Sequence, residues 1–164
     1  MLKPNLLTLL NDQVNHELYS SYLYLSMAAY FQSKNMNGFA NWMMMQSGEE
    51  REHGMKFYEY IFDRGDKVTL QAISAPPVEW ASPLALFEEV LRHEQKVTSL
   101  IHTIYAAAVK DGDYPTQVML HWFIDEQVEE EKNAAEVIEY LKMAGDAPGA
   151  LMMLDRQLGA RAGD

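Results

Sequence analysis

The residues best suited to chemistry lie in the stretch QSGEEREHGMKF, where a glutamate and a histidine stand three positions apart. On an α-helix, side chains with this spacing share one face, so the Glu50 carboxylate and the His53 imidazole point the same way. Steps of four and three residues through both give the seam Phe39, Met43, Gln46, Glu50, His53, Phe57 and Tyr60. A largely apolar seam of this kind faces the interior of a helical bundle. A charge placed there needs a partner or a metal ion.

Three further segments carry ionisable or polar side chains in the middle of similar seams. These residues are Glu17 with Tyr24 two turns away on the same face, Glu94, and Gln127 with Glu130. Packed helices bring mid-length positions to one level, so four carboxylates would meet in a pocket of low dielectric constant. Desolvation there costs several kcal/mol per ion, and mutual repulsion adds to it. Two divalent cations would balance four carboxylates. Oxygen ligands with one imidazole suit iron or manganese, with zinc as a competitor.

Each of these residues also has an ordinary structural explanation. A single glutamate on an apolar face often extends to water. Tyr24 suits core packing as well as a bond to a ligand or the supply of an electron, and Trp122 suits packing or redox chemistry. Four carboxylates at matching depth favour the metal interpretation. The other four histidines fall off the seam positions and are expected at the surface or an interface; they are His16, His93, His102 and His121.

A second acidic set lies beside the first. Its members are Glu49, Glu126, Glu129 and Glu130. Three of them share a helix face at spacings of three and four residues. The set predicts either a solvated charged face or a further cation site just outside the bundle centre, in which Glu130 is shared.

The seams and the helix-breaking residues predict an all-α fold of four long helices and a short fifth one. The expected spans are 5–33, 38–64, 83–110, 115–144 and 148–158. Short turns make each long pair antiparallel. Residues 65–83 contain two consecutive prolines and cannot be helical. Fully extended, they reach about 60 Å, against about 40 Å for the second helix. Such a crossover makes the third helix parallel to the second, which is the topology of the ferritin-like four-helix bundle, here expected as a single domain over 1–164.

Composition narrows the possible partners. The formal net charge of −11 argues against nucleic acid and favours cations as ligands. The chain has no cysteine, which excludes disulfides and thiolate metal sites. No apolar run is long enough to cross a membrane, and the first residues lack a secretory pattern, so we expect a cytoplasmic protein without a membrane partner.

The chain resembles the bacterial non-haem ferritins in the order and spacing of MLKPN, HELYSSYLY, EEREH, HEQKV, DYPT and EQVEEEK. The resemblance implies an iron-storage protein that oxidises Fe²⁺ with O₂ or H₂O₂ at a di-iron ferroxidase centre inside each subunit. It also implies a hollow homo-oligomeric cage of 24 subunits that holds ferric mineral. By position, the first iron site would be Glu17, Glu50 and His53. The second would be Glu50, Glu94 and Glu130, with Gln127 and Tyr24 beside it. A third would be Glu49, Glu126, Glu129 and Glu130.

Differences between this sequence and those of other di-iron protein families distinguish the alternative functions. Haem-binding bacterioferritins carry a second histidine where this chain has Glu130, and no methionine here is a clear haem ligand, so no haem is expected. A rubrerythrin-like peroxidase would bring a cysteine-based electron donor that the sequence lacks. A non-catalytic bundle used for protein contacts predicts a small particle without metal. The resemblance also places 148–158 at a fourfold axis and makes Asp111 and Asp113 candidates for iron-entry pores.

Overall fold

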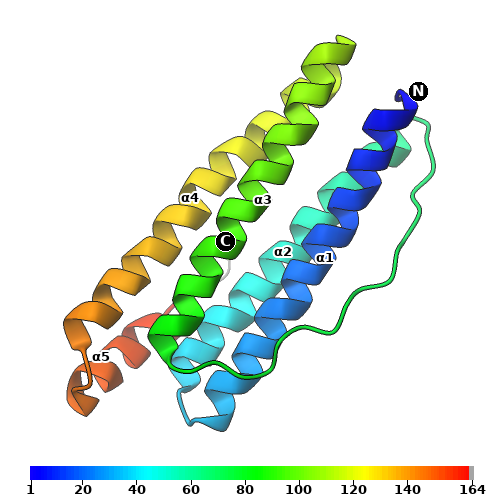
Figure 1. The fold of residues 1–164 in the computed structure, drawn as a ribbon. Coiled ribbons are helices and arrows are strands. Elements are labelled where there is room, and N and C mark those ends of the chain that lie inside the picture. Colours follow the sequence, from blue (N-terminus) through cyan, green and yellow to red (C-terminus); the bar gives the residue numbers. More distant parts are fainter. Residues whose placement is uncertain (163–164) are drawn as a thin grey trace.

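The computed structural model describes residues 1–162. Its five helices are α1 (Pro4–Ser33), α2 (Asn37–Asp63), α3 (Pro83–Asp111), α4 (Tyr114–Ala144) and α5 (Pro148–Gly159). The described range contains no β-strand. In Figure 1, α1 and α2 run antiparallel, α3 and α4 do the same, and α5 lies at one end of the bundle. The predicted all-α topology is confirmed, and the helix boundaries differ from the predicted ones by a residue or so. No helix within 1–162 is both long and apolar enough to span a bilayer.

The crossover of residues 64–82 runs along the bundle from the end of α2 to the start of α3 (Figure 1). Because it has no regular secondary structure, its backbone groups need other partners. α1 supplies several of them: the Asn11 Oδ1 atom accepts from the Thr69 amide at 2.7 Å, and the Ser26 hydroxyl donates to the Pro77 carbonyl at 2.6 Å. These bonds hold the crossover against the outside of α1. The second and third helices therefore run parallel, as the length of this segment predicts.

Local capping explains where α3 begins and ends and where α4 begins. The Ser82 side chain accepts from the Ala85 amide at 3.1 Å, and the Asp113 side chain accepts from the Thr116 amide at 3.0 Å. Each satisfies a backbone donor that the first turn leaves unpaired. Gly112 ends α3 with φ of 65°, in the left-handed region where a side chain is disfavoured. The two helices can thus reverse direction within a short turn.

The aspartates around this turn are engaged by basic side chains of the same chain. Asp113 receives two hydrogen bonds of 2.7 Å from the Arg64 guanidinium, which ties the end of α2 to the start of α4. This pairing holds the pKa of the Asp113 carboxyl well below its usual range. Asp111 pairs with Lys3 at 3.1 Å. The role of both aspartates at iron-entry pores stays a prediction.

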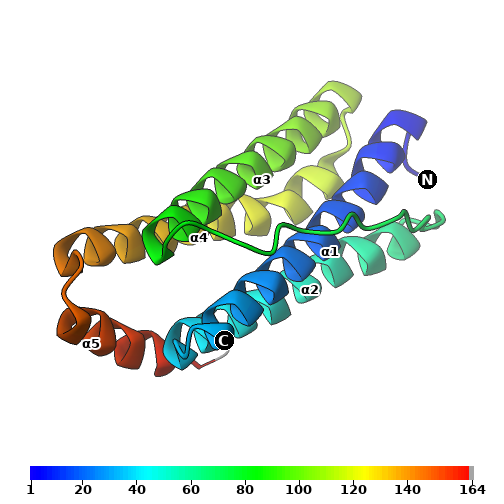
Figure 2. The same ribbon diagram turned by 60° about the horizontal axis from the view of Figure 1, so that its bottom comes forward.

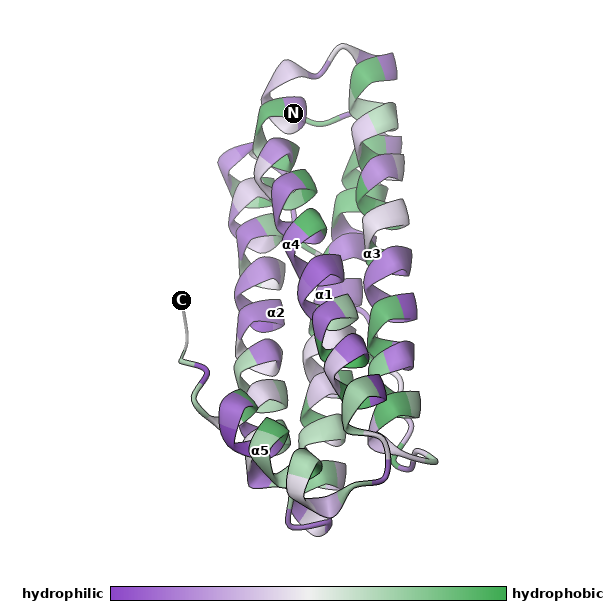
Figure 3. Ribbon diagram, turned by 90° about the vertical axis from the view of Figure 1, so that its left-hand side faces the viewer, coloured by the Kyte–Doolittle hydropathy of each residue, from purple (hydrophilic) through white to green (hydrophobic). Residues whose placement is uncertain are grey.

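Two apolar clusters fill the bundle, and the ionisable residues lie between them along the helices. One cluster includes Phe31 and Phe39, whose rings stack at 4.9 Å between centroids. The other includes Phe57 and Phe123, stacked at 4.1 Å. Hydrophilic and hydrophobic residues alternate along each long helix in Figure 3, as expected for helices with one apolar stripe. The polar middle is therefore sealed at both ends by packed side chains.

The predicted seam is correct at every position of α1 and α4, but it is displaced on α3. Four predicted α3 positions are only half-buried; they are Leu84, Leu91, Thr98 and Tyr105. The residues directly before the last three are buried instead, namely Val90, Val97 and Ile104. The buried stripe of a helix in a globular protein is wider than a strict coiled-coil seam. On α3 this stripe is centred one residue earlier than the predicted seam. Glu94 belongs to this stripe in either phase and is buried.

The close packing of α5 on the start of α2 yields a stability prediction. Figure 2 shows α5 lying across that end of the bundle. A Cβ atom on Gly38 would lie 1.6 Å from the Asp155 backbone carbonyl oxygen, whereas one on Gly48 meets no described atom within 4 Å. We expect Gly38→Ala to destabilise the protein by about 2 kcal/mol or more, because α5 must move away. Gly48→Ala should stabilise it by up to about 1 kcal/mol through helix propensity. Thermal unfolding followed by circular dichroism tests the pair, and equal melting temperatures would contradict this packing.

Candidate metal centre

Each of the four long helices contributes one buried glutamate to the polar middle of the bundle. These are Glu17 from α1, Glu50 from α2, Glu94 from α3 and Glu130 from α4, each at most 4% exposed. Their ligand atoms form two groups in which all atoms lie within 4.8 Å of one another. One consists of Glu17, Glu50 and His53, and the other of Glu50, Glu94 and Glu130. The structure therefore brings together the five residues predicted for the first two iron positions, and Glu50 belongs to both groups.

The first group forms where α1 and α2 approach closely. A Cβ atom on Gly54 would lie 3.3 Å from the Glu17 Cβ atom, so the glycine permits this approach. Gln13 donates to Glu17 Oε1 at 2.8 Å and fixes that carboxylate. The His53 Nδ1 atom lies 3.7 Å from Glu50 Oε2. The carboxylate of Glu50 and the imidazole one helical turn away thus face Glu17.

Two aromatic side chains pack against the His53 ring. Phe123 and Trp122 meet it edge-on, with centroids 6.1 and 5.2 Å away. Trp122 is 40% exposed, and the Lys56 ammonium lies 2.9 Å from its ring centroid. Trp122 therefore packs between the metal-ligand candidate and solvent, and its redox role stays a prediction.

The second group is held by hydrogen bonds from neutral side chains. The Tyr24 hydroxyl donates to Glu94 Oε1, and Gln127 donates to Glu94 Oε2 at 3.1 Å. Gln46 donates to Glu130 Oε2 at 2.6 Å and to Glu50 Oε1 at 3.4 Å. Gln127 and Tyr24, both predicted beside the second position, do lie next to Glu94.

Burial and mutual repulsion make this arrangement costly without a cation. Burial raises the pKa of Glu94 to about 7 and that of Glu130 to about 8, with further upward contributions from neighbouring carboxylates. The pKa values of Glu17 and Glu50 are raised well above the ordinary value for the same reasons. Among the described residues, neither Glu17 Oε2 nor Glu50 Oε2 has a hydrogen-bond partner. Buried oxygens without a hydrogen-bond partner are rare. Carboxylate oxygens of this kind are suitable ligands for hard divalent cations.

The second acidic set is only partly assembled. His53, Glu126 and Glu130 form a third group whose ligand atoms lie within 4.8 Å of one another. Glu129 is exposed, and Glu49 Oε2 accepts from Arg161 at 2.6 Å. The structure thus brings together two of the four predicted residues, with His53 as an addition. A third cation position stays a prediction.

One of the off-seam histidines, His93, packs against Tyr24. It is half-buried, its Nε2 atom lies 2.7 Å from the Ser20 hydroxyl, and its ring meets Tyr24 edge-on at 5.9 Å between centroids. Burial lowers the pKa of His93 to about 4. The displaced seam of α3 is the signal that identifies it, because steps of three and four residues link Val90, His93 and Val97. His93 therefore packs against Tyr24 and stays partly exposed.

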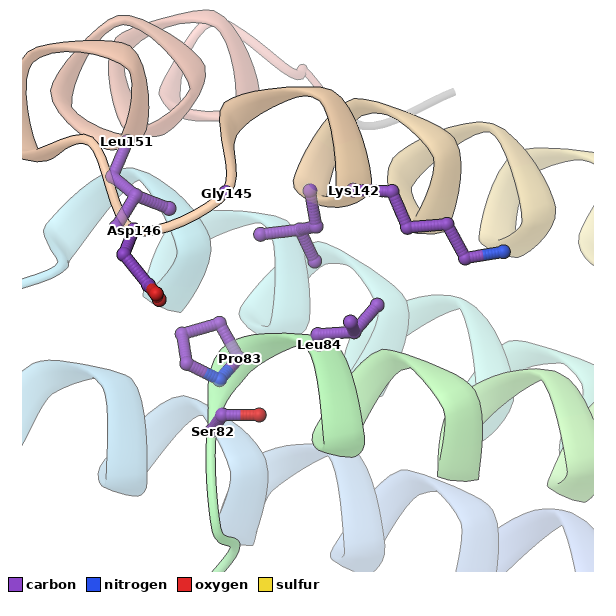
Figure 4. Close-up of a pocket in the computed structure, with 8 residues that line it drawn as sticks. Ser82, Pro83, Leu84, Lys142, Gly145, Asp146 and Leu151 are labelled. Atoms are coloured by element: carbon purple, nitrogen blue, oxygen red, sulfur yellow. The ribbon is translucent and has the colours of Figure 1, made fainter.

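A surface pocket of about 360 Å³ lies away from the carboxylates. It is formed where α3 begins, α4 ends and α5 begins, and its lining includes Leu84, Lys142, Asp146 and Leu151 (Figure 4). None of the metal-ligand candidates lines it. The candidate centre is accordingly a packed polar interior between helices and not an open cleft.

The raised pKa values predict how the stability of the metal-free protein depends on pH. An exposed glutamate titrates near 4.5, whereas Glu94 and Glu130 titrate near 7 and 8 in the folded protein. Between these values the folded state holds protons that the unfolded chain has released, so the free energy of unfolding falls as pH rises. This contribution is complete below about pH 4.5 and lost above about pH 8, and it is on the order of 5–10 kcal/mol. Chemical denaturation with a chelator measures it. Glu130→Gln should flatten the decline, and a free energy that does not fall over this range contradicts the prediction.

Comparison with known proteins agrees with the fold. A family model described as a ferritin-like domain matches residues 7–144. Bacterial non-heme ferritins of Staphylococcus aureus and Staphylococcus saprophyticus are each 44% identical over 164 residues, covering 100% of this chain and 99% and 98% of theirs. An Archaeoglobus fulgidus ferritin engineered into a closed form is 43% identical with a TM-score of 0.98, and 100% of each chain is covered. An open-pore ferritin of the same archaeon is 44% identical with a TM-score of 0.97 over 98% of each chain. The resemblance predicted from the sequence is confirmed: the chain belongs to the ferritin family, in the bacterial non-haem group.

Proposed function

We propose that the protein stores iron, oxidising Fe²⁺ to Fe³⁺ at the carboxylate cluster and holding the product as ferric mineral inside a homo-oligomeric cage. The observation that carries this proposal is the convergence of four buried glutamates, one from each long helix, with two carboxylate oxygens that accept no hydrogen bond from any described residue. The names of the relatives support iron as the cargo. The negative net charge of −11 favours the accumulation of cations.

We infer the roles of the residues in this ferroxidase from the two ligand groups. Glu17, Glu50 and His53 would hold the first Fe²⁺. Glu50, Glu94 and Glu130 would hold the second, so that Glu50 bridges the two ions. Carboxylate-bridged metals in proteins lie about 3.5–4 Å apart, close enough to act on one oxidant. The four carboxylates compensate the charge of two Fe²⁺ ions.

The chemistry requires two electrons and a route for the product. Two Fe²⁺ ions give one electron each to O₂, which takes up two protons and leaves as H₂O₂. When H₂O₂ is the oxidant, the same two electrons reduce it to water. The Fe³⁺ ions then bind hydroxide from water, release protons and move to the cavity, where the ferric mineral grows. Tyr24 donates a hydrogen bond to Glu94 and would keep that carboxylate in position beside the second ion.

The remaining features of the proposal follow the family resemblance. Glu126 and Glu130, with Glu49 and Glu129 further out, would bind a third cation next to the ferroxidase centre. Twenty-four copies of one domain spanning 1–164 would form the cage in the cytoplasm, without haem, nucleic acid or membrane.

Aerobic addition of Fe²⁺ to the metal-free protein tests the proposed function. We expect rapid oxygen consumption and iron that co-elutes with a protein particle of roughly half a megadalton, the order of magnitude for 24 copies of an 18.8 kDa chain. A small particle that oxidises Fe²⁺ no faster than buffer would instead support a non-catalytic helical bundle.

A further inference from the structure

Arg161 lies just beyond α5 and reaches from the C-terminal segment to the middle of α2. Its Nη1 atom donates to Gln46 Oε1 at 3.0 Å, and its Nη2 atom donates to Glu49 Oε2 at 2.6 Å. The guanidinium stands over the Trp42 ring, 4.6 Å from the centroid. Its side chain is only 20% exposed. Asn41 donates to the Arg161 backbone carbonyl at 3.1 Å, which fixes the segment itself. The guanidinium is thus anchored on three sides.

The contact with Gln46 decides which way that amide faces. A guanidinium has only donors, so the atom of Gln46 that faces it must be the carbonyl oxygen. The amide nitrogen then points into the carboxylate cluster, where it donates to Glu130 Oε2 at 2.6 Å and to Glu50 Oε1 at 3.4 Å. The opposite orientation would set the amide oxygen against two carboxylate oxygens. Arg161 and the carboxylates therefore select the same orientation of Gln46.

We propose that Arg161 is a positioning residue for the metal centre, which acts through Gln46 to hold Glu130 and Glu50 ready for the second cation. This inference rests on the proposed function. A carboxylate that already accepts a hydrogen bond is fixed in place, so the cation does not have to order it on binding. The C-terminal segment after α5 thereby sets the affinity of a site formed by α2, α3 and α4.

Anaerobic titration of Co²⁺ into the metal-free, assembled protein tests this inference. Co²⁺ is a stable stand-in for Fe²⁺, and its visible absorption reports the coordinating groups. We expect two Co²⁺ per subunit at the cluster of the wild-type protein. Arg161→Gln should weaken the second Co²⁺ about tenfold, the size expected for the loss of a charge-assisted hydrogen bond. The control is Arg156→Gln, which removes the same charge from the exposed surface of α5 and should leave both affinities unchanged.

A double-mutant cycle separates positioning from simple anchoring of the segment. Gln46→Leu alone should weaken the second Co²⁺ by a similar factor, and adding Arg161→Gln to it should change the affinity by less than about twofold. An anchor alone would lower the melting temperature in both backgrounds and leave Co²⁺ binding unaltered. Wild-type Co²⁺ affinities in Arg161→Gln would overturn the inference, as would a full tenfold loss in the Gln46→Leu background.

Failed assembly of the Arg161→Gln variant and absence of Co²⁺ binding by the wild-type protein also have defined consequences. If Arg161→Gln does not assemble, Gln46→Leu carries the test alone, and an unchanged second affinity there overturns the inference. Failure of the wild-type protein to bind Co²⁺ at the cluster would overturn the proposed function, and this inference with it. That result is distinct from wild-type binding that the Arg161 and Gln46 variants leave unaffected.

Discussion

Replacement of Glu50 by alanine is expected to abolish the rapid oxidation of Fe²⁺, lowering the initial rate by more than about 100-fold. Removal of residues that merely orient metal ligands costs about 10- to 100-fold, and Glu50 is itself the ligand candidate common to both groups. Its loss removes one oxygen donor from each position and the bridge between them. Stopped-flow absorbance of the ferric product after aerobic mixing measures the initial rate.

Matched variants locate the effect at the cluster. Glu59→Ala removes an exposed carboxylate from the same helix and should oxidise Fe²⁺ at the wild-type rate. His53→Ala removes a ligand from the first group only, so its rate should fall, though less than that of Glu50→Ala. Equal initial rates in the wild-type protein, Glu50→Ala and His53→Ala would count decisively against a ferroxidase centre here.

Divalent cations should stabilise the metal-free protein by about 5 kcal/mol. A ligand present at about 100 times its dissociation constant adds about 2.7 kcal/mol per site to the free energy of unfolding, and two sites are expected. The physical cause is the relief of repulsion between buried carboxylates, whose pKa values are raised by burial and by one another. Chemical denaturation near pH 7.5, with and without Zn²⁺ or Co²⁺, measures the gain.

The same experiment on Glu50→Ala supplies the control. This variant lacks the shared ligand and one of the repelling charges, so the cation should add much less stability to it. A gain of equal size in the variant and the wild-type protein would show that the cations act elsewhere, for instance on the exposed acidic surface.

The cluster was predictable because helical periodicity fixes which side chains share a face. Glu17 and Glu130 each lie three or four residues from buried neighbours on both sides, and every seam position on their helices is buried. Antiparallel pairs with short turns then bring mid-helix residues to one level. Helix boundaries were predictable for a similarly local reason, because Ser82 and Asp113 cap the helices that follow them.

The features that sequence alone did not reveal depend on rotation or on long-range contact. The buried face of α3 is centred one residue earlier than the predicted seam, so the contact between His93 and Tyr24 does not follow from the predicted seam. Arg161 reaches Gln46 only because α5 docks on the start of α2, where Gly38 permits close approach. Spacing along α4 also grouped Glu129 with Glu126, although only Glu126 turns toward His53. The spacing of charged residues along one helix does not predict which side chains of another helix they contact.

An anomalous-scattering map from crystals soaked with Fe²⁺ shows whether the buried carboxylates bind iron. We expect two iron peaks in each subunit, about 3.5–4 Å apart, one among Glu17, Glu50 and His53 and the other among Glu50, Glu94 and Glu130. Iron found only on exposed carboxylates, with the interior cluster free of anomalous density, would contradict this prediction.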